Sequence, residues 1–541
     1  MAEKKTSYSK RGRKCWWAVV FLVLTFFSLT QNVVDSAAVN RHKREFVIPD
    51  WIEIVEESSF DGRSNVRRAV RIREAKVTYD GAQLWRVRPA DGQPVLQSGV
   101  LSEFEETGLF SVWSGNDTTM DIMVRQDAIP RVSRILREKN VRYDVVINDL
   151  QKAIDEENPP LSEELMEELE GRKDNLFHWR LIRKLEINSW IQNRSNFLAR
   201  YAWWQGMVVK KRSKYHPRPR PLRYPIANAY YVGGGGPWHF RGHRMEWTSY
   251  HRLDDIYGYL DFLAQTYPDV CSVMNIGNSA EGRPLKVLRI SNGKAGVPAL
   301  WIDGGTHARE WISPAAVTYI IDYLVENSES LEADYYILPV VNPDGYEYTF
   351  TNDRLWRKNR RNYAGSQCAG VDLNRNFGYK WGGLGTSRNP CSDIFAGSAA
   401  FSEPETNAIR NFFEASAADF KAYLTFHSYG QYFLYPWGYD RRVPPDYADL
   451  DRIGRNAAKA MKKADVAASS YTVGNSATTL YEAAGGSDDW AKAILKIKYS
   501  YTIELRDTGF YGFVLPARFI VPTAKEALAA VQVITEACKL L

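Results

Sequence analysis

The heptapeptide Gly304-Gly305-Thr306-His307-Ala308-Arg309-Glu310 sets a histidine and a carboxylate three residues apart. It follows Ala299–Asp303, an apolar run with the length of a buried strand, and its two glycines indicate a turn. A strand that closes on a turn can direct His307 and Glu310 at one point, as a Zn²⁺ ion requires. A lone His-x-x-Glu is a weak signal for a metal site. A catalytic zinc takes three protein ligands, so a third ligand must come from elsewhere in the chain.

Histidine is scarce in the C-terminal part of the chain. From residue 245 onward the only histidines are His251, His307 and His427. His251 starts an amphipathic helical pattern and is predicted to be a surface residue. His427 follows the apolar run 422–426 and so occupies the mouth of a second buried strand, as His307 does. Two imidazoles and one carboxylate favour a hydrolytic zinc, because structural zinc sites use mostly cysteine and close all four positions.

The length and charge of the chain limit its architecture and partners. With 541 residues it is too long for one hydrophobic core. Residues 245–541 hold 30 of the 70 Lys and Arg residues but 34 of the 64 Asp and Glu residues, so the upstream part is the basic one. No phosphate-binding glycine loop, zinc finger or aromatic-basic RNA motif occurs, and we expect no nucleic-acid partner.

Residues 1–38 are predicted to be a secretory signal peptide. Six Lys and Arg residues between positions 4 and 14 precede the apolar run 15–30, and small residues follow at 36–38. The alternative is an uncleaved membrane anchor, since about 20 apolar residues span a bilayer. The basic run 41–44 is interpreted as a processing site, and Asn116 and Asn193 head candidate glycosylation motifs.

Several motifs follow the His-x-x-Glu stretch along the chain. They are Val341-Asn342-Pro343-Asp344-Gly345-Tyr346, the run 354–358 (RLWRK), the run 368–377 (CAGVDLNRNF), the run 480–490 (LYEAAGGSDDW) and the run 501–509 (YTIELRDTG). Over residues 245–541 this set closely resembles the zinc metallocarboxypeptidases of the digestive type, the carboxypeptidase A and B family. Residues 45–160 show a weaker resemblance to the activation propeptide of that family.

The resemblance implies an α/β fold with a single mixed eight-stranded sheet flanked by helices at residues 245–541. A small α+β open-sandwich propeptide is expected at 45–160. Strand-like runs agree with the first expectation, at 287–288, 300–302, 336–341, 423–426 and 499–503. In the propeptide we predict strands at 75–79, 84–87 and 143–147 and a helix at 129–139. The resemblance also implies cis peptide bonds at Ser428-Tyr429, Pro436-Trp437 and Arg506-Asp507.

Residues 161–244 form a basic connecting segment that departs from the family pattern. Between positions 201 and 244 there are nine Lys and Arg residues and no acidic residue, and proline alternates with arginine at 217–221. Such a sequence is extended and exposed, which favours cleavage by an activating protease. A polyanion-binding strip and a plain solvated linker are the alternatives.

The resemblance also implies which residues carry the chemistry. The two-His, one-Glu zinc set is the one known for carboxypeptidase A, so it is transferred to this chain and not predicted afresh; its members are His307, Glu310 and His427. Glu504 matches the general base, and its alternative is a structural carboxylate paired with Arg506. Arg357 matches the cation that stabilises the developing oxyanion. Asp372 matches an acceptor that orients His307.

Substrate binding is assigned in the same way. Asn374, Arg375 and Tyr481 match the clamp on the terminal carboxylate of the substrate, and Arg309 and Arg354 match outer subsites. Asp488 matches the bottom of the specificity pocket, which is aspartate in the B type and aliphatic in the A type. A buried carboxylate there predicts a preference for C-terminal Arg or Lys. Gly438 follows the A-type pattern instead, and Ser476 matches neither type.

Five cysteines suit an exported chain with few crosslinks. The resemblance pairs Cys368 with Cys391, whereas a bridge between Cys271 and Cys538 is left open, because sequence cannot fix connectivity. The last helix is expected to begin with a capping box at Thr523-x-x-Glu526.

We therefore expect a secreted zinc-dependent exopeptidase, made as a zymogen, that removes C-terminal Arg or Lys from peptides and proteins. Its expected partners are peptide C-termini and an activating trypsin-like or furin-like protease, with a membrane only if the N-terminal segment is retained. The alternatives are an A-like preference for apolar C-termini and a membrane-tethered or non-catalytic binding protein.

Overall fold

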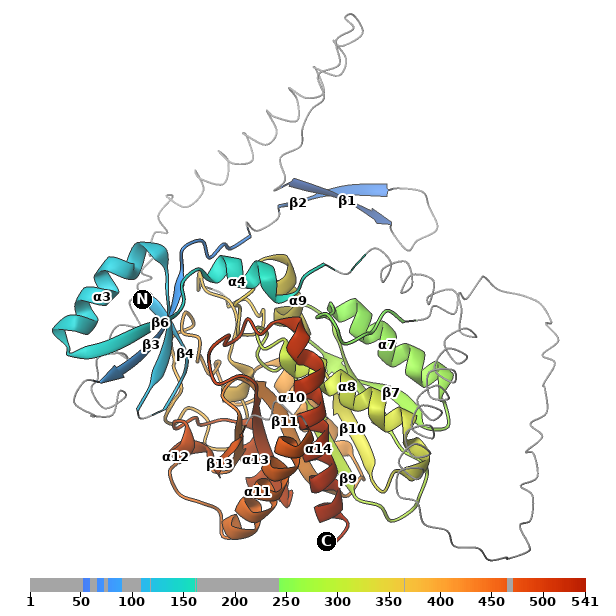
Figure 1. Cartoon of the computed structure of the whole chain (residues 1–541). Helices are drawn as coiled ribbons and strands as arrows, with labels where there is room; N and C mark the ends of the chain where they lie inside the picture. Colours follow the sequence, from blue (N-terminus) through green and yellow to red (C-terminus); the bar gives the residue numbers. More distant parts are fainter. Residues whose placement is uncertain are drawn as a thin grey trace, which may run out of the picture. The chain divides into compact units, whose positions relative to one another are not determined.

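The computed structural model describes residues 52–58, 66–72, 76–89, 109–116, 118–160, 162, 243–363, 365–464 and 470–541 (Figure 1). The predicted signal segment, the basic run 41–44, Asn193 and nearly all of the connecting segment lie outside these residues. Strands β1 (Ile52–Ser58) and β2 (Val66–Ile72) pair antiparallel and belong to a unit separate from residues 76–541. None of the described helices combines the length and the hydropathy needed to span a bilayer.

The described residues between 76 and 160, the expected propeptide, have a four-stranded antiparallel sheet in the order β4-β5-β3-β6. Its strands are β3 (Gln83–Pro89), β4 (Phe110–Gly115), β5 (Met120–Val124) and β6 (Val141–Ile147), and its helices are α3 (Ile129–Glu138) and α4 (Leu150–Glu157). Its core contains Trp85, Ile122 and Leu136, all buried. The strands predicted at 84–87 and 143–147 and the helix at 129–139 are confirmed.

The strand predicted at 75–79 is wrong for its described residues. Residues 76–79 form no strand, because their polar groups bond to the catalytic domain and to α4 instead of to the propeptide sheet. Val77 N donates to the carbonyl of Asn352 (2.8 Å), and the Tyr79 hydroxyl donates to Asp353 (2.6 Å). This segment therefore ties the propeptide to the catalytic domain.

The catalytic domain has the expected mixed eight-stranded sheet, in the order β13-β12-β14-β11-β9-β10-β8-β7. The strands are β7 (Cys271–Asn278), β8 (Pro284–Ile290), β9 (Ala299–Asp303), β10 (Asp334–Leu338), β11 (Phe420–Ser428), β12 (Tyr432–Tyr435), β13 (Thr472–Asn475) and β14 (Tyr499–Leu505). The central strands β10, β9, β11 and β14 are parallel to one another, and their C-terminal ends meet at one edge.

Both faces of this sheet are covered by helices, as Figure 1 shows. The core on one face includes α7 (Leu253–Thr266), α8 (Ile312–Glu326), α11 (Tyr447–Ala464) and α14 (Ile520–Cys538), and that on the other includes α10 (Pro404–Ala415) and α13 (Ser487–Ala493). Within β9, Leu300 and Ile302 pack on the first face and Trp301 on the second, since strand side chains alternate. The remaining α-helices in the described part of this domain are α9 (Pro343–Thr351) and α12 (Ser476–Thr479).

The capping box predicted for the last helix is wrong. Helix α14 already begins at Ile520, and the Thr523 hydroxyl donates to the carbonyl of Phe519 (2.7 Å) inside the first turn. Glu526 does not return to the helix start, because its carboxylate accepts from Arg506 (2.5 Å) and from the Tyr471 hydroxyl (3.1 Å).

The covalent and backbone expectations are met. Cys368 and Cys391 form a disulfide, whereas Cys271 and Cys538 are free and buried. The three peptide bonds expected to be cis, at Ser428-Tyr429, Pro436-Trp437 and Arg506-Asp507, are cis.

Candidate active site

The ends of two neighbouring parallel strands bring the expected metal ligands together. β9 ends at Asp303, and the chain then turns through Gly304 and Gly305 toward α8. A side chain at Gly304 would meet Ser313 Oγ at 2.7 Å, and Gly305 has a φ of +63°, so both positions favour glycine. The turn carries His307 and Glu310, and β11 supplies His427.

The geometry of these three residues suits a divalent metal. His307 Nδ1 lies 2.7 Å from one Glu310 oxygen, His427 Nδ1 lies 3.0 Å from the other, and the two Nδ1 atoms are 3.1 Å apart. One ligand atom from each residue falls within a common distance of 4.8 Å. Two imidazole nitrogens and a carboxylate directed at one buried point form the donor set of a catalytic zinc. The residues present therefore fit the ion.

Asp372 links the metal ligands to the expected oxyanion-stabilising arginine. Its Oδ1 lies 3.0 Å from His307 Nε2, which leaves Nδ1 of that ring free for a metal. Its Oδ2 accepts from Arg357 Nη2 at 2.9 Å and from Arg357 Nε at 3.1 Å. Despite complete burial, Arg357 and His307 hold the pKa of Asp372 well below its usual range. Asp372 thus stays ionised and fixes both neighbours.

Glu504 lies on β14, directly beside His427 of β11 in the sheet register. Burial raises the pKa of Glu504 to about 8, with the charge of His427 opposing and that of Glu310 adding to the shift. A divalent cation next to it lowers this pKa again. Arg506, the alternative partner considered for Glu504, pairs with Glu526. Glu504 is therefore a half-buried carboxyl group whose raised pKa suits proton exchange near neutral pH.

A pocket of about 700 Å³, measured with its open mouth, joins the metal site to the expected substrate residues. Beside His307 and Glu310 it is lined by Asn374, Arg375, Tyr481, Asp488, Arg357 and Glu504. Gly438 and Ser476 also line it, as the resemblance implied for the specificity wall. Asp488 is 5% exposed, and among the described residues no Lys or Arg forms an ion pair with it.

The structure does not bring the two outer-subsite arginines into this pocket. Arg309 is buried against the ring of Phe513, with its guanidinium carbon 4.3 Å from the ring centre. Arg354 is held by Glu157, the last residue of the propeptide helix α4, with Nε–Oε2 and Nη2–Oε1 distances of 2.7 and 2.5 Å. In this form of the chain, Glu157 of the propeptide therefore pairs with Arg354, the residue predicted to bind substrate.

Sequence reasoning missed the propeptide residues that line the pocket, Trp113 and Ser114 of β4. Trp113 packs against Phe513 of the catalytic domain at 4.9 Å between ring centres, whereas Phe110 packs inside the propeptide. Burial in β4 does not alternate for this reason, so a period of two is absent. Asp121 of β5 accepts from the Tyr429 hydroxyl at 2.9 Å, which adds a second contact beside the site.

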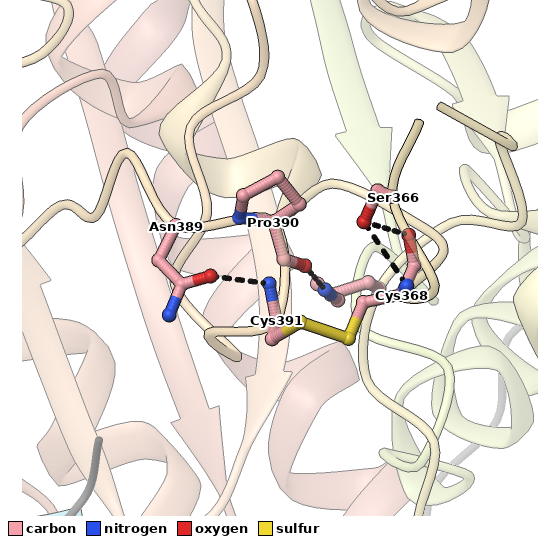
Figure 2. The surroundings of a disulfide bond; sticks show 6 residues. Ser366, Cys368, Asn389, Pro390 and Cys391 are labelled. Atoms are coloured by element: carbon pink, nitrogen blue, oxygen red, sulfur yellow. Dashed lines mark hydrogen bonds between the residues drawn. A yellow bond between two sulfur atoms is a disulfide. The ribbon is translucent and has the colours of Figure 1, made fainter. Parts of the chain in front are cut away.

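The disulfide closes the loop that carries three of the site residues (Figure 2). Asp372, Asn374 and Arg375 lie between Cys368 and Cys391, which are 23 residues apart. Hydrogen bonds from Cys391 N to Asn389 Oδ1 and from Cys368 N to Ser366 Oγ, both 3.0 Å, support the two ends of the bridge. The crosslink thus limits the motion of the loop at its base.

His251 is not the surface residue that its helical pattern predicted. Its side chain is only 8% exposed and lies 3.3 Å from Glu246 and 3.9 Å from Asp255. Although burial opposes the charged form, these carboxylates raise the pKa of His251 to about 9. The histidine is therefore a structural cation, and it takes no part in the metal cluster.

The sequence model described as zinc carboxypeptidase matches residues 256–530, about half of the chain. The chain belongs to this family. The carboxypeptidase activation peptide model matches residues 85–157, from within β3 to the end of α4. This zinc carboxypeptidase is thus a hydrolase that carries its own activation propeptide, and its cofactor is Zn²⁺.

Relatives of this carboxypeptidase carry both B and A names. It is 49% identical to carboxypeptidase B of Astacus astacus, over 54% of this chain and 99% of that protein. It is 45% identical to carboxypeptidase B of Rattus norvegicus, over 55% of this chain and 72% of that protein. Among solved structures, carboxypeptidase A from Helicoverpa armigera has a TM-score of 0.63 at 28% identity and covers 85% of this chain and 98% of its own. Thrombin activatable fibrinolysis inhibitor gives 0.64 at 29% identity, with coverages of 85% and 100%.

Proposed function

We propose that this zinc exopeptidase removes Arg or Lys from the C-termini of peptides and proteins. The observation that carries the proposal is Asp488, a buried carboxylate in the wall of the pocket without an ion-pair partner among the described residues. Burial raises the pKa of Asp488 above its ordinary value. A cationic side chain that enters the pocket compensates this burial, whereas an apolar one leaves it uncompensated.

Asp488, and not its neighbour Asp489, is the carboxylate available to a substrate. Asp489 is fully buried and accepts hydrogen bonds from the backbone of Gly438 (2.9 Å) and Tyr439 (2.9 Å). Its oxygens therefore hold the wall of the pocket in place. The different partners of the two carboxylates support a preference for basic C-terminal side chains.

The proposed roles of the remaining residues follow from their positions. His307, Glu310 and His427 would hold Zn²⁺, which would supply the Lewis acidity that polarises the scissile carbonyl and lowers the pKa of water. Glu504 accepts a proton beside that site and returns it to the leaving amine. Arg357, fixed by Asp372, places a cation where negative charge develops on the carbonyl oxygen.

Recognition of the chain end falls to the polar groups around the pocket. Asn374, Arg375 and Tyr481 bind the terminal carboxylate, which restricts cleavage to the last residue. The guanidinium of Arg375 is already oriented, since it donates to the carbonyls of Gly385 (2.8 Å) and Asn374 (2.9 Å). Such fixed donors lower the cost of ordering on substrate binding.

The second candidate is an A-like preference for apolar C-termini. It is favoured by Gly438, which adds no side chain to the pocket wall, and by relatives named carboxypeptidase A2 and A4 from Mus musculus, at 42% identity each. The two candidates differ in the sign of one measurable preference.

The decisive experiment compares peptides that end in Arg or in Phe. We expect kcat/KM to be higher for the Arg-ended peptide in the parent enzyme. In Asp488→Ile the ratio of the two should fall by roughly 10²–10³-fold, since removing one member of a buried charge pair costs about 3–5 kcal/mol. Ser476→Ala, which changes the same wall without removing a charge, should leave the ratio nearly unchanged. A parent ratio below one supports the A-like candidate.

We also propose how the protein is processed. Residues 1–38 form a secretory signal, residues 45–160 the activation propeptide and residues 245–541 the catalytic domain of an extracellular enzyme. A trypsin-like or furin-like protease cuts within residues 161–244, at Lys210, Lys211, Arg212 or Arg244. Membrane attachment would require retention of the N-terminal segment. Because every residue of the metal site and Glu504 are present, a non-catalytic binding role is not supported.

A further inference from the structure

His427 directs Nδ1 at the other metal ligands, and its second ring nitrogen, Nε2, has no role in the proposed mechanism. The corresponding nitrogen of His307 lies against Asp372. His427 Nε2 lies 3.2 Å from the hydroxyl of Thr425, two residues earlier on the same face of β11. Both residues are at most 1% exposed, so water does not substitute for this contact.

The Thr425 hydroxyl in turn faces a buried carboxylate. Thr425 lies opposite Asp303 in the register of β11 and β9, and Asp303 is 1% exposed. Asp303 Oδ2 accepts from Trp301 Nε1 at 2.6 Å, while Oδ1 has no hydrogen bond of ordinary geometry within the described part of the chain. Burial raises the pKa of Asp303, and interactions with the hydroxyls of Thr425 and Tyr423 and with His427 oppose that shift.

We propose that Thr425 and Asp303 are positioning residues that hold His427 ready to bind the metal through Nδ1. The His427 Nε2–H donates to Thr425 Oγ, and the Thr425 hydroxyl donates to Asp303. A hydroxyl can do both, since it has one hydrogen and two acceptor lone pairs. The proton is then kept on Nε2, which leaves the Nδ1 lone pair directed at Glu310 and His307.

The two metal histidines are thus supported in different ways. His307 meets a carboxylate directly, and His427 meets one through a hydroxyl, from the neighbouring strand β9. The inference rests on the zinc site proposed above, since it concerns a ligand of that site. It assigns a function to Asp303, a buried carboxylate that the mechanism otherwise does not use.

The test measures the zinc dissociation constant of the full-length chain by competition with a chelator. Thr425→Val removes the hydroxyl while keeping the side-chain shape, and Asp303→Asn removes the charge. Both should weaken zinc binding by about 10–100-fold, the usual effect of losing a group that supports a metal ligand. Thr425→Ser keeps the hydroxyl and should bind zinc like the parent. Tyr423→Phe removes the other hydroxyl near Asp303, which does not contact His427, and should also bind like the parent.

Two further readouts separate positioning from general stability. The metal-free Thr425→Val chain should still unfold in one cooperative transition, which shows that weaker zinc binding does not come from a loss of the fold. With Co²⁺ in place of zinc, the visible absorption bands should shift in Thr425→Val but not in Thr425→Ser. Parent-like zinc affinity in Thr425→Val and Asp303→Asn would overturn the inference, as would equal losses in Thr425→Val, Thr425→Ser and Tyr423→Phe.

A reference variant distinguishes this inference from the zinc site itself. His427→Ala should lose zinc, and the parent should bind one zinc per chain. If His427→Ala retains parent affinity, the proposed metal site is wrong. If it loses zinc while Thr425→Val does not, only the roles of Thr425 and Asp303 are wrong.

Discussion

Three carboxyl groups in or beside the pocket differ in their partners. Burial raises the pKa of Asp488, Asp489 and Glu504, although Glu504 is only half-buried. Asp489 is satisfied by backbone donors, Glu504 lies beside the metal ligands, and Asp488 faces the space that a substrate enters. Similar desolvation is therefore combined with different partners at the three positions.

Substitution of Glu504 by glutamine separates metal binding from proton transfer. Glu504→Gln should retain one zinc per chain, since Glu504 is not a member of the metal cluster. Its kcat should fall by about 10²–10⁴-fold because the amide cannot accept the proton. Zinc content by metal analysis and kcat on one peptide are measured for the same preparation, and chelation should abolish the activity of the parent. Near-parent turnover would remove Glu504 from the mechanism.

At this scale the sequence named most of the residues that the structure brings together around the pocket, but only through a resemblance, and their roles stay predictions. His307, Glu310, Asn374, Arg375 and Asp488 lie in short motifs, and motif spacing carries over when the fold is shared. The contacts that come from distant chain were not predictable in this way. The pairing of Arg354 with Glu157 and that of Arg506 with Glu526 each depend on tertiary packing, which neither periodicity nor spacing encodes.

Among the elements, helix α4 ends in a buried ion pair between propeptide and enzyme. Its last residue, Glu157, is 1% exposed, and Arg354 packs over Trp311 with 3.7 Å between the guanidinium carbon and the ring centre. Arg354 also donates to the carbonyls of Arg309 and Phe513, both at 2.9 Å. Burial raises the pKa of Glu157 to about 7, and Arg354 opposes the shift. The position of the C-terminal end of α4 therefore depends on the ion pair between Glu157 and Arg354.

Removing that charge should loosen the propeptide before any cleavage. In Glu157→Ala the buried guanidinium keeps its charge but loses its partner, which typically costs about 3–5 kcal/mol. We expect the uncut full-length chain to hydrolyse a small C-terminal substrate at least ~10-fold faster than the parent, because part of the stabilisation of the docked propeptide is lost.

The matched control for this experiment is Glu156→Ala, one residue earlier on α4, where the side chain is 69% exposed and 3.9 Å from Lys152. An exposed pair of this kind contributes little, so basal activity should not change. Electrophoresis confirms that each chain is uncut during the assay. Equal basal activity in both variants and the parent would show that the end of α4 does not restrain the propeptide.

Several elements with a regular burial pattern were predicted, whereas β4 and the fully buried strand β5 were not. The helix at 129–138 and the central strands of the large sheet show a clear period or a continuous apolar run. β4 was missed because its buried residues face two different domains, and Thr523 imitated a helix start that lies three residues earlier. Local pattern fails where the partner is remote or the cap is a backbone group.

Across the whole molecule, the buried carboxylate of Glu405, which lies away from the active site, couples stability to pH. Glu405 of α10 accepts from Ala280 N (2.9 Å) and from Asn359 Nδ2 (3.1 Å), and no Lys or Arg of the described chain pairs with it. Burial raises its pKa from 4.5 to about 7. The folded state therefore holds a proton that the unfolded state has released between these values, so stability from this group is full below about pH 4.5 and is lost as pH rises through about 7.

Glu405→Gln should reduce this dependence. The loss of unfolding free energy between pH 5 and pH 8 should be smaller than in the parent by on the order of 2–3 kcal/mol, because one pKa unit corresponds to about 1.4 kcal/mol. Chemical denaturation at several pH values, at constant zinc concentration, measures it. The control is Glu414→Gln on the same helix, where the side chain is 64% exposed. Parallel curves for the parent and Glu405→Gln would exclude Glu405 as the source.

The contacts of Asp372 have a consequence for how this site can vary over generations. One carboxylate serves His307, Arg357 and the backbone N–H of Asn374, so the residues proposed for ion binding, carbonyl polarisation and substrate clamping share a single anchor. Substitutions at these positions are expected to be strongly non-additive: once Asp372 is lost, a second change at Arg357 has little further effect. Such a shared anchor makes gradual remodelling difficult, and inactive descendants of this sequence should therefore have lost several of these residues together.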